Sequence, residues 1–245
     1  MSRDRIALIH GVGLDGSMWG PLRELLEPEF EVQVLELLGH GNRPPAPEGV
    51  TLAELAEDIA ERLHPETHLV GFSLGALVAQ YIARFRPELV KTLVSVASVC
   101  SRTPEEQASV LARLATAEAD FGQTVEASIR RWYPEGSGVA PELIEQTREV
   151  LKRNDPRSFL ACYRVFAIAD TEIEPELPRI SVPALAVTGE FDPGSTPEMS
   201  ARLAAAIPDC SYAVVAGARH MMPVERPREL ATLLTAFIKE HSNVD

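Results

Sequence analysis

The sequence has few cysteines and no long apolar run, and both absences restrict the class of protein. Its 245 residues include three cysteines, Cys100, Cys162 and Cys210, which are far apart in the chain. An odd, scattered set of thiols argues against a disulfide framework and against a zinc site. No segment approaches the roughly 18 consecutive apolar residues of a membrane-spanning helix. Residues 1–5 lead directly into the apolar run 6–9, without a secretory leader. We therefore expect a cytoplasmic protein.

Basic residues are scarce relative to acidic ones. The chain has 23 Lys and Arg against 36 Asp and Glu, a formal net charge of −13. This excess of negative charge argues against nucleic acid and against an anionic membrane as partners. The content of 45% hydrophobic and 24% charged residues is ordinary for a globular protein of one domain, or of one domain with an insertion. None of these values indicates a substrate or an oligomeric state.

The most informative stretch is Gly71-Phe72-Ser73-Leu74-Gly75, which joins an apolar strand pattern to an amphipathic helix pattern. Gly-x-Ser-x-Gly at a strand-to-helix turn is typical of a nucleophile elbow. The turn presents the serine hydroxyl, and bulk two positions before or after the serine would collide with neighbouring backbone. The N–H of Leu74 should lie at the positive end of the following helix. An ordinary glycine turn is the alternative for this motif in isolation.

Strand and helix patterns alternate along both ends of the chain. Apolar runs at 6–9, 32–37, 68–72 and 89–97, and again at 180–187 and 212–215, are separated by helix patterns. Such alternation predicts an α/β protein with a mostly parallel sheet and helices on both faces.

The region between about 101 and 178 breaks this alternation. Its predicted helices are 104–119, 124–132, 141–153 and 157–168. They indicate an inserted helical cap, and the alternative is a continued alternation with one poorly marked strand.

Polar residues follow three of the predicted strands. Ser73, Asp192 and His220 should meet, because ligands and catalytic groups of an open parallel sheet collect beyond the carboxyl ends of its strands. A serine hydroxyl needs a base such as histidine, and the histidine needs a carboxylate that fixes its tautomer. The order Ser…Asp…His is that of an α/β-hydrolase triad. Asp192 as a turn former, His220 as a plain loop residue, and Glu190 as a substitute acid are the alternatives.

The loop His10-Gly11-Val12-Gly13 is predicted to face Ser73 with free N–H groups. Residues 11–16 also spell Gly-x-Gly-x-x-Gly, the dinucleotide-binding pattern, which we consider the weaker interpretation. His40 lies between two glycines, and such a histidine more often braces a loop than acts in catalysis.

Together these motifs resemble those of the α/β-hydrolase superfamily over essentially the whole chain. The segments that carry the resemblance are His10-Gly11-Val12-Gly13, Gly39-His40-Gly41, Gly71-Phe72-Ser73-Leu74-Gly75, Gly189-Glu190-Phe191-Asp192-Pro193 and Gly217-Ala218-Arg219-His220. The chain is most similar to the small capped carboxyl-ester and lactone hydrolases, such as 3-oxoadipate enol-lactonases and the pimeloyl-carrier-protein methyl ester esterase. Because five residues precede Ile6 in the sequence, we expect no counterpart of the first two strands of larger relatives.

The resemblance implies a division of the chain and a set of oxyanion donors. Residues 1–100 and 179–245 would form the core, and 101–178 the cap. The N–H groups of Val12 and Leu74 would hold the oxyanion. Serine at the nucleophile position speaks against haloalkane dehalogenases and epoxide hydrolases.

The expected activity is serine-dependent cleavage of a small-molecule carboxylic ester or lactone through an acyl-enzyme, with no cofactor or metal. C–C bond hydrolysis, acyl transfer to an alcohol, and a non-catalytic binding role are the alternatives. Arg130, Trp132 and Phe166 are our candidates for substrate contacts, and Arg131, Tyr133 and Arg164 are also available. Solvated helix faces and ordinary packing are the alternative for all six.

Overall fold

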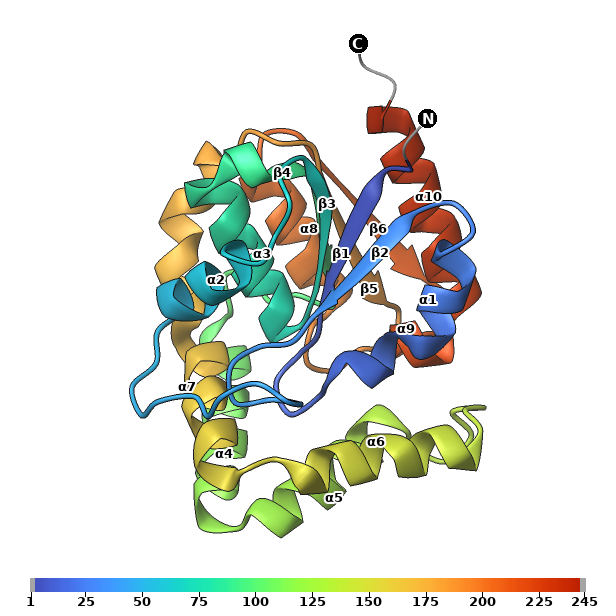
Figure 1. Ribbon diagram of the computed structural model, residues 1–245. Helices are drawn as coiled ribbons and strands as arrows, with labels where there is room; N and C mark the ends of the chain where they lie inside the picture. The colour runs from blue at the N-terminus through green and yellow to red at the C-terminus, as the bar shows by residue number, and fades with distance from the viewer. Residues whose placement is uncertain (1–2, 243–245) are drawn as a thin grey trace.

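The computed structural model describes residues 3–242 and centres on a six-stranded sheet in which every neighbouring pair is parallel. The strands are β1 (Arg5–Ile9), β2 (Glu31–Leu35), β3 (Thr67–Phe72), β4 (Val90–Val96), β5 (Ala184–Gly189) and β6 (Cys210–Val215). Their order is β2-β1-β3-β4-β5-β6 (Figure 1). Because the strands are parallel, their carboxyl ends share one edge. The predicted α/β class is confirmed.

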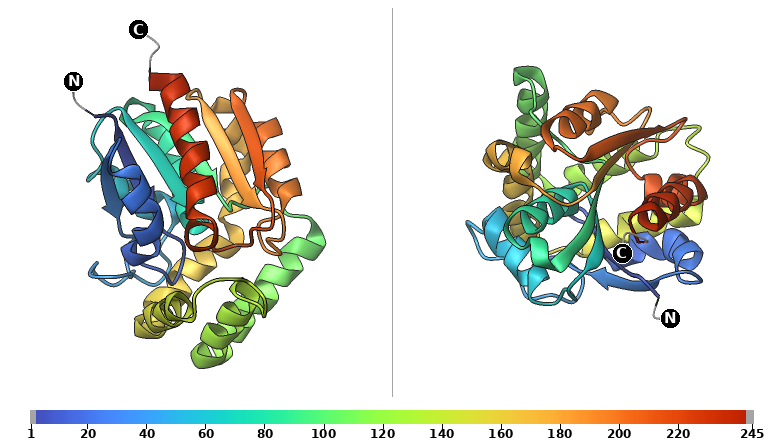
Figure 2. Two further views of the ribbon diagram at one scale, coloured as in Figure 1. Left: turned by 90° about the vertical axis from the view of Figure 1, so that its right-hand side faces the viewer. Right: turned by 90° about the horizontal axis from the view of Figure 1, so that it is seen from above.

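Helices cover both faces of the sheet. Outside residues 101–178 they are α1 (Gly20–Leu26), α2 (Leu52–Ala60), α3 (Leu74–Phe85), α8 (Pro197–Ala206), α9 (Met222–Glu225) and α10 (Pro227–Ser242), with short 3-10 turns η1 (Gly16–Trp19) and η2 (Pro87–Leu89). α1 and α10 lie on one face, and α2, α3 and α8 on the other (Figures 1 and 2). Alternate residues of β1 serve the two faces: Ile6 and Leu8 pack with α1 and α10, and Ala7 and Ile9 with α2 and α3.

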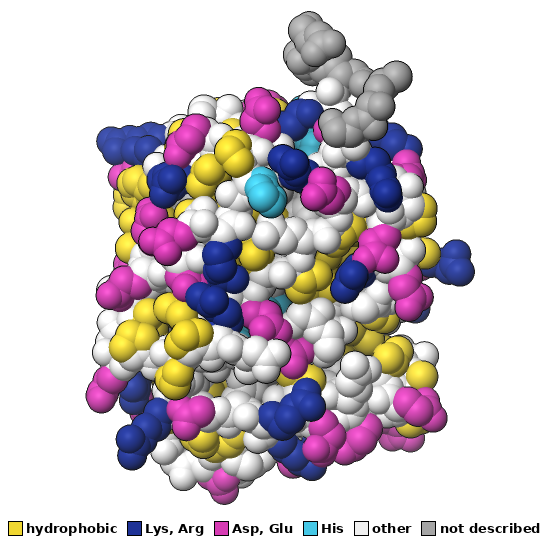
Figure 3. Space-filling model, in the orientation of Figure 1, with side chains coloured by type: hydrophobic (Ala, Val, Ile, Leu, Met, Phe, Trp, Pro, Cys, Tyr) yellow, Lys and Arg dark blue, Asp and Glu magenta, His cyan; other side chains and the backbone are white. Residues whose placement is uncertain are grey.

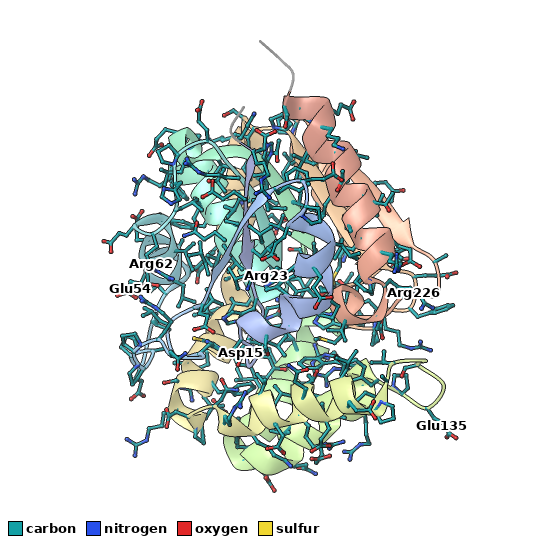
Figure 4. The ribbon with its side chains drawn as sticks, turned by 45° about the vertical axis from the view of Figure 1, so that its right-hand side comes forward. Asp15, Arg23, Glu54, Arg62, Glu135 and Arg226 are labelled. Carbon is teal, nitrogen blue, oxygen red and sulfur yellow. The ribbon has the colours of Figure 1, made fainter. Side chains whose placement is uncertain are left out.

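The start of α2 follows directly from its sequence. Thr51 Oγ1 accepts a hydrogen bond from the Glu54 N–H at 3.2 Å, and the Glu54 carboxylate accepts one from the Thr51 N–H at 2.8 Å. This reciprocal pair satisfies two N–H groups that a helix start leaves free. Glu54 is labelled on this helix in Figure 4.

Four helices occupy the interval between β4 and β5. They are α4 (Pro104–Ala119), α5 (Phe121–Trp132), α6 (Pro141–Arg153) and α7 (Pro156–Ile173), followed by the 3-10 turn η3 (Glu174–Arg179). We call residues 101–178 the helical segment. It lies beyond the carboxyl ends of the strands (Figures 1 and 2). All residues of the helical segment are described and none is in a strand, so the continued-alternation alternative is wrong.

Polar contacts join parts of the helical segment to one another and join the segment to the core. Near its start, Arg102 Nη1 donates to Asp170 Oδ1 at 2.6 Å, and the exposed fractions of the two side chains are 2% and 1%. Near the end of α6, Asn154 Nδ2 donates to the Gly13 carbonyl at 2.8 Å, and Arg153 pairs with Asp15 at 3.6 Å. Asp15 marks this junction in Figure 4. The contacts of Asn154 and Arg153 therefore join the helical segment to the loop that follows β1.

Replacing Arg102 by Met should lower the free energy of unfolding by about 3–5 kcal/mol, because Asp170 would remain buried without its charge partner. Urea denaturation measures this loss. Arg164→Met is the matched control: Arg164 also pairs with a carboxylate, that of Glu118, but both side chains are more than 40% exposed. Such a pair contributes about 0–1 kcal/mol. Equal losses in the two variants would contradict the expected role of burial.

The surface mixes charges of both signs on the face in view. Acidic and basic side chains are interspersed over that face in Figure 3. Among residues 3–242, no helix is long and apolar enough to cross a membrane. The three cysteines are free thiols, and Cys100 and Cys162 are buried.

Candidate active site

Ser73 occupies a strained turn between β3 and α3. Its φ of 53° and ψ of −114° lie outside the regions that L-residues prefer, and its N–H donates to the Val96 carbonyl at 2.9 Å. The glycines at positions 71 and 75 are required because no space is left there for a Cβ atom. A Cβ on Gly71 would lie 2.1 Å from the Gly75 carbonyl oxygen, and one on Gly75 would lie 2.4 Å from the Ile9 carbonyl oxygen. Strain of this kind, held by surrounding structure, is typical of functional positions.

His220 and Asp192 are joined by a hydrogen bond beside Ser73. His220 Nδ1 and Asp192 Oδ2 are 2.7 Å apart, and the exposed fractions of the two residues are 8% and 3%. The other oxygen of Asp192 accepts from the Gly194 and Ser195 N–H groups at 2.9 and 3.0 Å. Because an ionised Asp192 can only accept, the bonded Nδ1 carries the proton and Nε2 remains available as a base.

The imidazole of His220 is held between two aromatic rings. Phe72 lies 4.9 Å from it, centroid to centroid, and Trp132 of α5 stacks on it at 5.7 Å with 25° between the planes. In the described part of the chain no direct hydrogen bond joins Ser73 to His220, although both line the same pocket. In ligand-free enzymes this contact is often long and tightens when substrate binds.

Glu190, the alternative acid, has a different partner. Its carboxylate accepts from the Gly217 N–H at 2.8 Å and thereby connects the loops after β5 and β6. Within the described residues, the carboxylate bonded to His220 is that of Asp192. The geometry therefore favours Asp192 for the role that the sequence leaves open between the two.

The loop after β1 lies against Ser73 and offers a free donor. A Cβ on Gly11 would lie 3.1 Å from the Ser73 Cβ, which shows how closely this loop approaches the serine. The Gly13 N–H is already bound, since it donates to His40 Nε2 at 2.8 Å. Among the described residues, the Val12 N–H has no hydrogen-bond acceptor. Leu74 is the first residue of α3, so its N–H has no partner inside the helix.

Two buried histidines brace this loop in their neutral form. His40 accepts from Gly13 through Nε2 and donates through Nδ1 to the Leu38 carbonyl at 2.9 Å. His10 accepts from the Leu37 N–H at 3.1 Å and donates to the Gly11 carbonyl at 2.8 Å. Burial lowers the pKa of His10 to about 4 and the pKa of His40 to about 3.

Stability should therefore fall in mild acid. Between the ordinary histidine pKa of about 6.5 and the lowered folded values, the unfolded chain binds protons that the folded chain does not, so stability is complete above pH 6.5 and lost as the pH falls. Each histidine should contribute about 1.4 kcal/mol per pH unit in that window. Urea unfolding at pH 7 and pH 5 measures the slope, and His40→Gln should reduce it. If the slope of stability against pH were the same in His40→Gln and in the wild type, His40 would not be a source of the pH dependence.

The pocket over Ser73 is lined by both the core and the helical segment. It spans about 570 Å³, part of it open to solvent. Its walls include the core residues Val12, Ser73, Asp192 and His220, and from the helical segment Arg113, Arg131, Trp132, Phe159, Tyr163 and Phe166. The structure thus brings together all three residues of the predicted triad and one predicted oxyanion donor, together with Trp132 and Phe166 of the three candidates for substrate contact.

The structure does not place Arg130, the third candidate for substrate contact, at the pocket, because its side chain is exposed and outside the pocket wall. The helix turns Arg131 inward instead. Arg164 is also exposed, paired with Glu118. Tyr133 is buried away from the pocket wall, and its hydroxyl lies 3.0 Å from Thr147 Oγ1. Sequence reasoning misses Arg113 entirely.

The spacing of apolar residues in α4 could have predicted that Arg113 faces inward. Arg113 is three residues after Val110 and four before Ala117, the buried residues of that helix. This spacing places it on the same face of the helix.

Comparison with known proteins assigns this geometry to a class of enzyme. Residues 6–233 match the Alpha/beta hydrolase family, and the chain belongs to that family. It is 30% identical over 242 residues to the pimeloyl-[acyl-carrier protein] methyl ester esterase of Aeromonas salmonicida, covering 95% of this chain and 94% of that protein. It is 27% identical over 238 residues to the (E)-2-((N-methylformamido)methylene)succinate hydrolase of Acinetobacter baylyi, covering 96% and 90%.

Solved structures agree with this assignment. A thermophilic esterase from Thermogutta terrifontis, with malate bound, superposes with a TM-score of 0.85 at 27% identity, covering 98% of this chain and 91% of that one. The resemblance inferred from the motifs is confirmed, as is the prediction that the protein is a hydrolase.

Proposed function

We propose that the protein is a serine hydrolase that cleaves a small-molecule carboxylic ester or lactone, with Ser73 as nucleophile, His220 as base and Asp192 as its orienting acid. The observation that carries the proposal is the 2.7 Å bond between His220 and Asp192 beside a serine held at positive φ. Ester hydrolysis is supported by the similarity to two proteins that are named as esterases, those of Aeromonas salmonicida and Thermogutta terrifontis.

In the proposed reaction His220 Nε2 takes the hydroxyl proton as Ser73 Oγ attacks the carbonyl carbon. The resulting oxyanion is held by the N–H groups of Val12 and Leu74, each worth about 2.7–4 kcal/mol of barrier. His220 then gives the proton to the leaving alkoxide, and the ester C–O bond breaks to form the acyl-enzyme. In a lactone the released hydroxyl stays on the same molecule.

Deacylation uses the same groups in reverse. His220 takes a proton from water, the hydroxide adds to the acyl carbon, and the carboxylic acid leaves as Ser73 recovers its proton. Asp192 stabilises the imidazolium in both halves without becoming protonated. We further propose that the helical segment, residues 101–178, serves as a cap over the core formed by 1–100 and 179–245, because its side chains form much of the pocket wall.

Two measurements test this proposal. A fluorophosphonate probe should form a covalent adduct on Ser73, located by mass spectrometry of the digested protein. Product analysis over a panel of simple esters, lactones and vinylogous diketones, with and without an added alcohol, should give acid plus alcohol from esters and hydroxy acid from lactones. Absence of an adduct would favour a binding protein. Cleavage of the diketones alone, or transfer to the alcohol alone, would favour C–C hydrolysis or acyl transfer.

A further inference from the structure

We propose that Arg113 and Arg131 form a carboxylate-binding subsite in the pocket over Ser73, so that the preferred substrate is an ester or lactone that itself carries a carboxylate. The inference rests on the proposed function, since it names the substrate class of that same site. Half-esters of dicarboxylic acids, which carry one ester group and one free carboxylate, belong to this class.

Both arginines come from the helical segment and line the same pocket as Ser73 and His220. Arg113 is contributed by α4 and Arg131 by α5, two helices that pack against each other. Each side chain is partly buried. A substrate whose carbonyl reaches Ser73 therefore occupies a space that two guanidinium groups also enclose.

The hydrogen bonds of both guanidinium groups go to serine hydroxyls. Arg113 Nη1 donates to Ser109 Oγ at 2.8 Å, and Arg131 Nη2 donates to Ser128 Oγ at 3.2 Å. Arg131 also lies over the Trp132 ring, with its Cζ 5.8 Å from the centroid. In the part of the chain that the structure describes, no Asp or Glu oxygen lies within 4.0 Å of a nitrogen of either side chain. Most N–H donors of both groups thus remain available.

Several other arginines of the helical segment are paired with carboxylates. Arg102 is bonded to Asp170, Arg148 to Glu126, and Arg164 to Glu118. In a chain with 36 acidic residues and 23 basic ones, partners for an arginine are plentiful. Arg113 and Arg131 are partly buried and have no carboxylate partner among residues 3–242. This is unusual, because charges removed from water are normally paired.

The local electrostatics favour an incoming anion. Burial lowers the pKa of Arg131; Tyr163 opposes this shift, and the like charge of Arg113 acts in the same direction as burial. Asp192 is the acidic residue that acts on Arg131, but both of its oxygens are already occupied by His220 and by the Gly194 and Ser195 N–H groups. A bound carboxylate would relieve the repulsion between the two arginines and replace their lost solvation.

The rest of the wall suits a short carbon chain between the two polar ends. Trp132, Phe159, Tyr163 and Phe166 supply aromatic surface in the pocket that the arginines share with the core residues. Guanidinium groups match planar carboxylates through two parallel hydrogen bonds, which favours a carboxylate over a merely polar group.

The test compares two esters that differ in one charge. Mono-p-nitrophenyl glutarate and p-nitrophenyl butyrate share a leaving group, and the ratio of their kcat/KM values reports recognition of the distal carboxylate. We expect the wild type to prefer the glutarate ester by at least about tenfold. Arg131→Gln and Arg113→Gln should each reduce that ratio by about 10- to 100-fold, the range for a hydrogen bond to a charged group. Arg131→Lys should keep part of the preference.

Arg130→Gln is the matched control, because Arg130 is the neighbouring residue on α5 and is exposed outside the pocket. Its ratio should equal that of the wild type. A wild-type ratio of one or below would overturn the inference, and so would Arg113 and Arg131 variants that slow both esters equally. If neither ester is cleaved and the fluorophosphonate forms no adduct, the proposed function itself fails; cleavage of the neutral ester without preference leaves that function standing and refutes only the subsite.

Discussion

A Ser73→Ala variant should lose about 10⁵- to 10⁶-fold in kcat on p-nitrophenyl butyrate while keeping its fold. Removal of Oγ removes the proposed nucleophile. In the proposed reaction neighbouring water cannot replace it efficiently, because His220 would take its proton from that oxygen. The remaining rate would come from the free N–H groups of Val12 and Leu74 and from substrate binding.

Folding should not change, because alanine places the same Cβ as serine at the strained φ of 53°. Circular dichroism and the thermal midpoint check this. Ser101→Ala is a matched control, since Ser101 also has a positive φ, 46°, but lies outside the pocket wall and bonds Glu174 at 2.6 Å. That variant should retain wild-type turnover. Equal turnover in Ser73→Ala and wild type would reject Ser73 as nucleophile.

The sheet and the elbow are predictable because their constraints are local. A strand buried on both faces is a continuous apolar run, as in residues 6–9, and its length and flanking glycines distinguish it from a helix. The turn at Ser73 requires small residues at Gly71 and Gly75, because a Cβ at either would meet backbone within 2.4 Å. Requirements of this kind are visible in the residue types themselves.

The pocket walls are less predictable because they depend on tertiary packing. Arg130 and Arg131 are adjacent in the sequence, and α5 turns one outward and the other into the pocket. Which of them faces inward depends on how α5 packs against α4 and α6, and the sequence pattern of α5 does not determine this. The same holds for α7, which runs from Pro156 to Ile173 where the apolar pattern predicts 157–168. Packing of α7 against α3 and α4 stabilises a longer helix than its own pattern indicates.

The sequence predicts that His40 braces a loop, but it does not predict that Gly13 is the residue to which His40 is bonded. A histidine between two glycines indicates a bracing role, whereas its acceptor position toward Gly13 depends on two loops that are 27 residues apart in the chain. The bond occupies the Gly13 N–H, whereas the Val12 N–H, the proposed oxyanion donor of this loop, has no acceptor among the described residues.

An Asp192→Asn variant should lose about 10⁴-fold in kcat with little change in fold. The reason lies in how the side chain is held. One oxygen accepts from the Gly194 and Ser195 N–H groups, and the other accepts from His220 Nδ1. If the amide oxygen of the substituted side chain keeps the two backbone donors, its NH₂ group points at Nδ1. His220 must then carry its proton on Nε2, the nitrogen that should receive the proton of Ser73.

Turnover of p-nitrophenyl butyrate over a range of pH measures this loss, and fluorophosphonate labelling should slow in parallel because both reactions need the same base. Glu190→Gln is the matched control: Glu190 precedes Asp192 by two residues and bonds the Gly217 N–H, whereas the bond to His220 comes from Asp192. We expect its kcat to remain within a few-fold of wild type. The reverse pattern, with Glu190→Gln inactive and Asp192→Asn active, would transfer the orienting role to Glu190. Because both carboxylates anchor backbone N–H groups at this edge of the sheet, a purely structural effect would appear in both variants, and a tautomer effect only in Asp192→Asn.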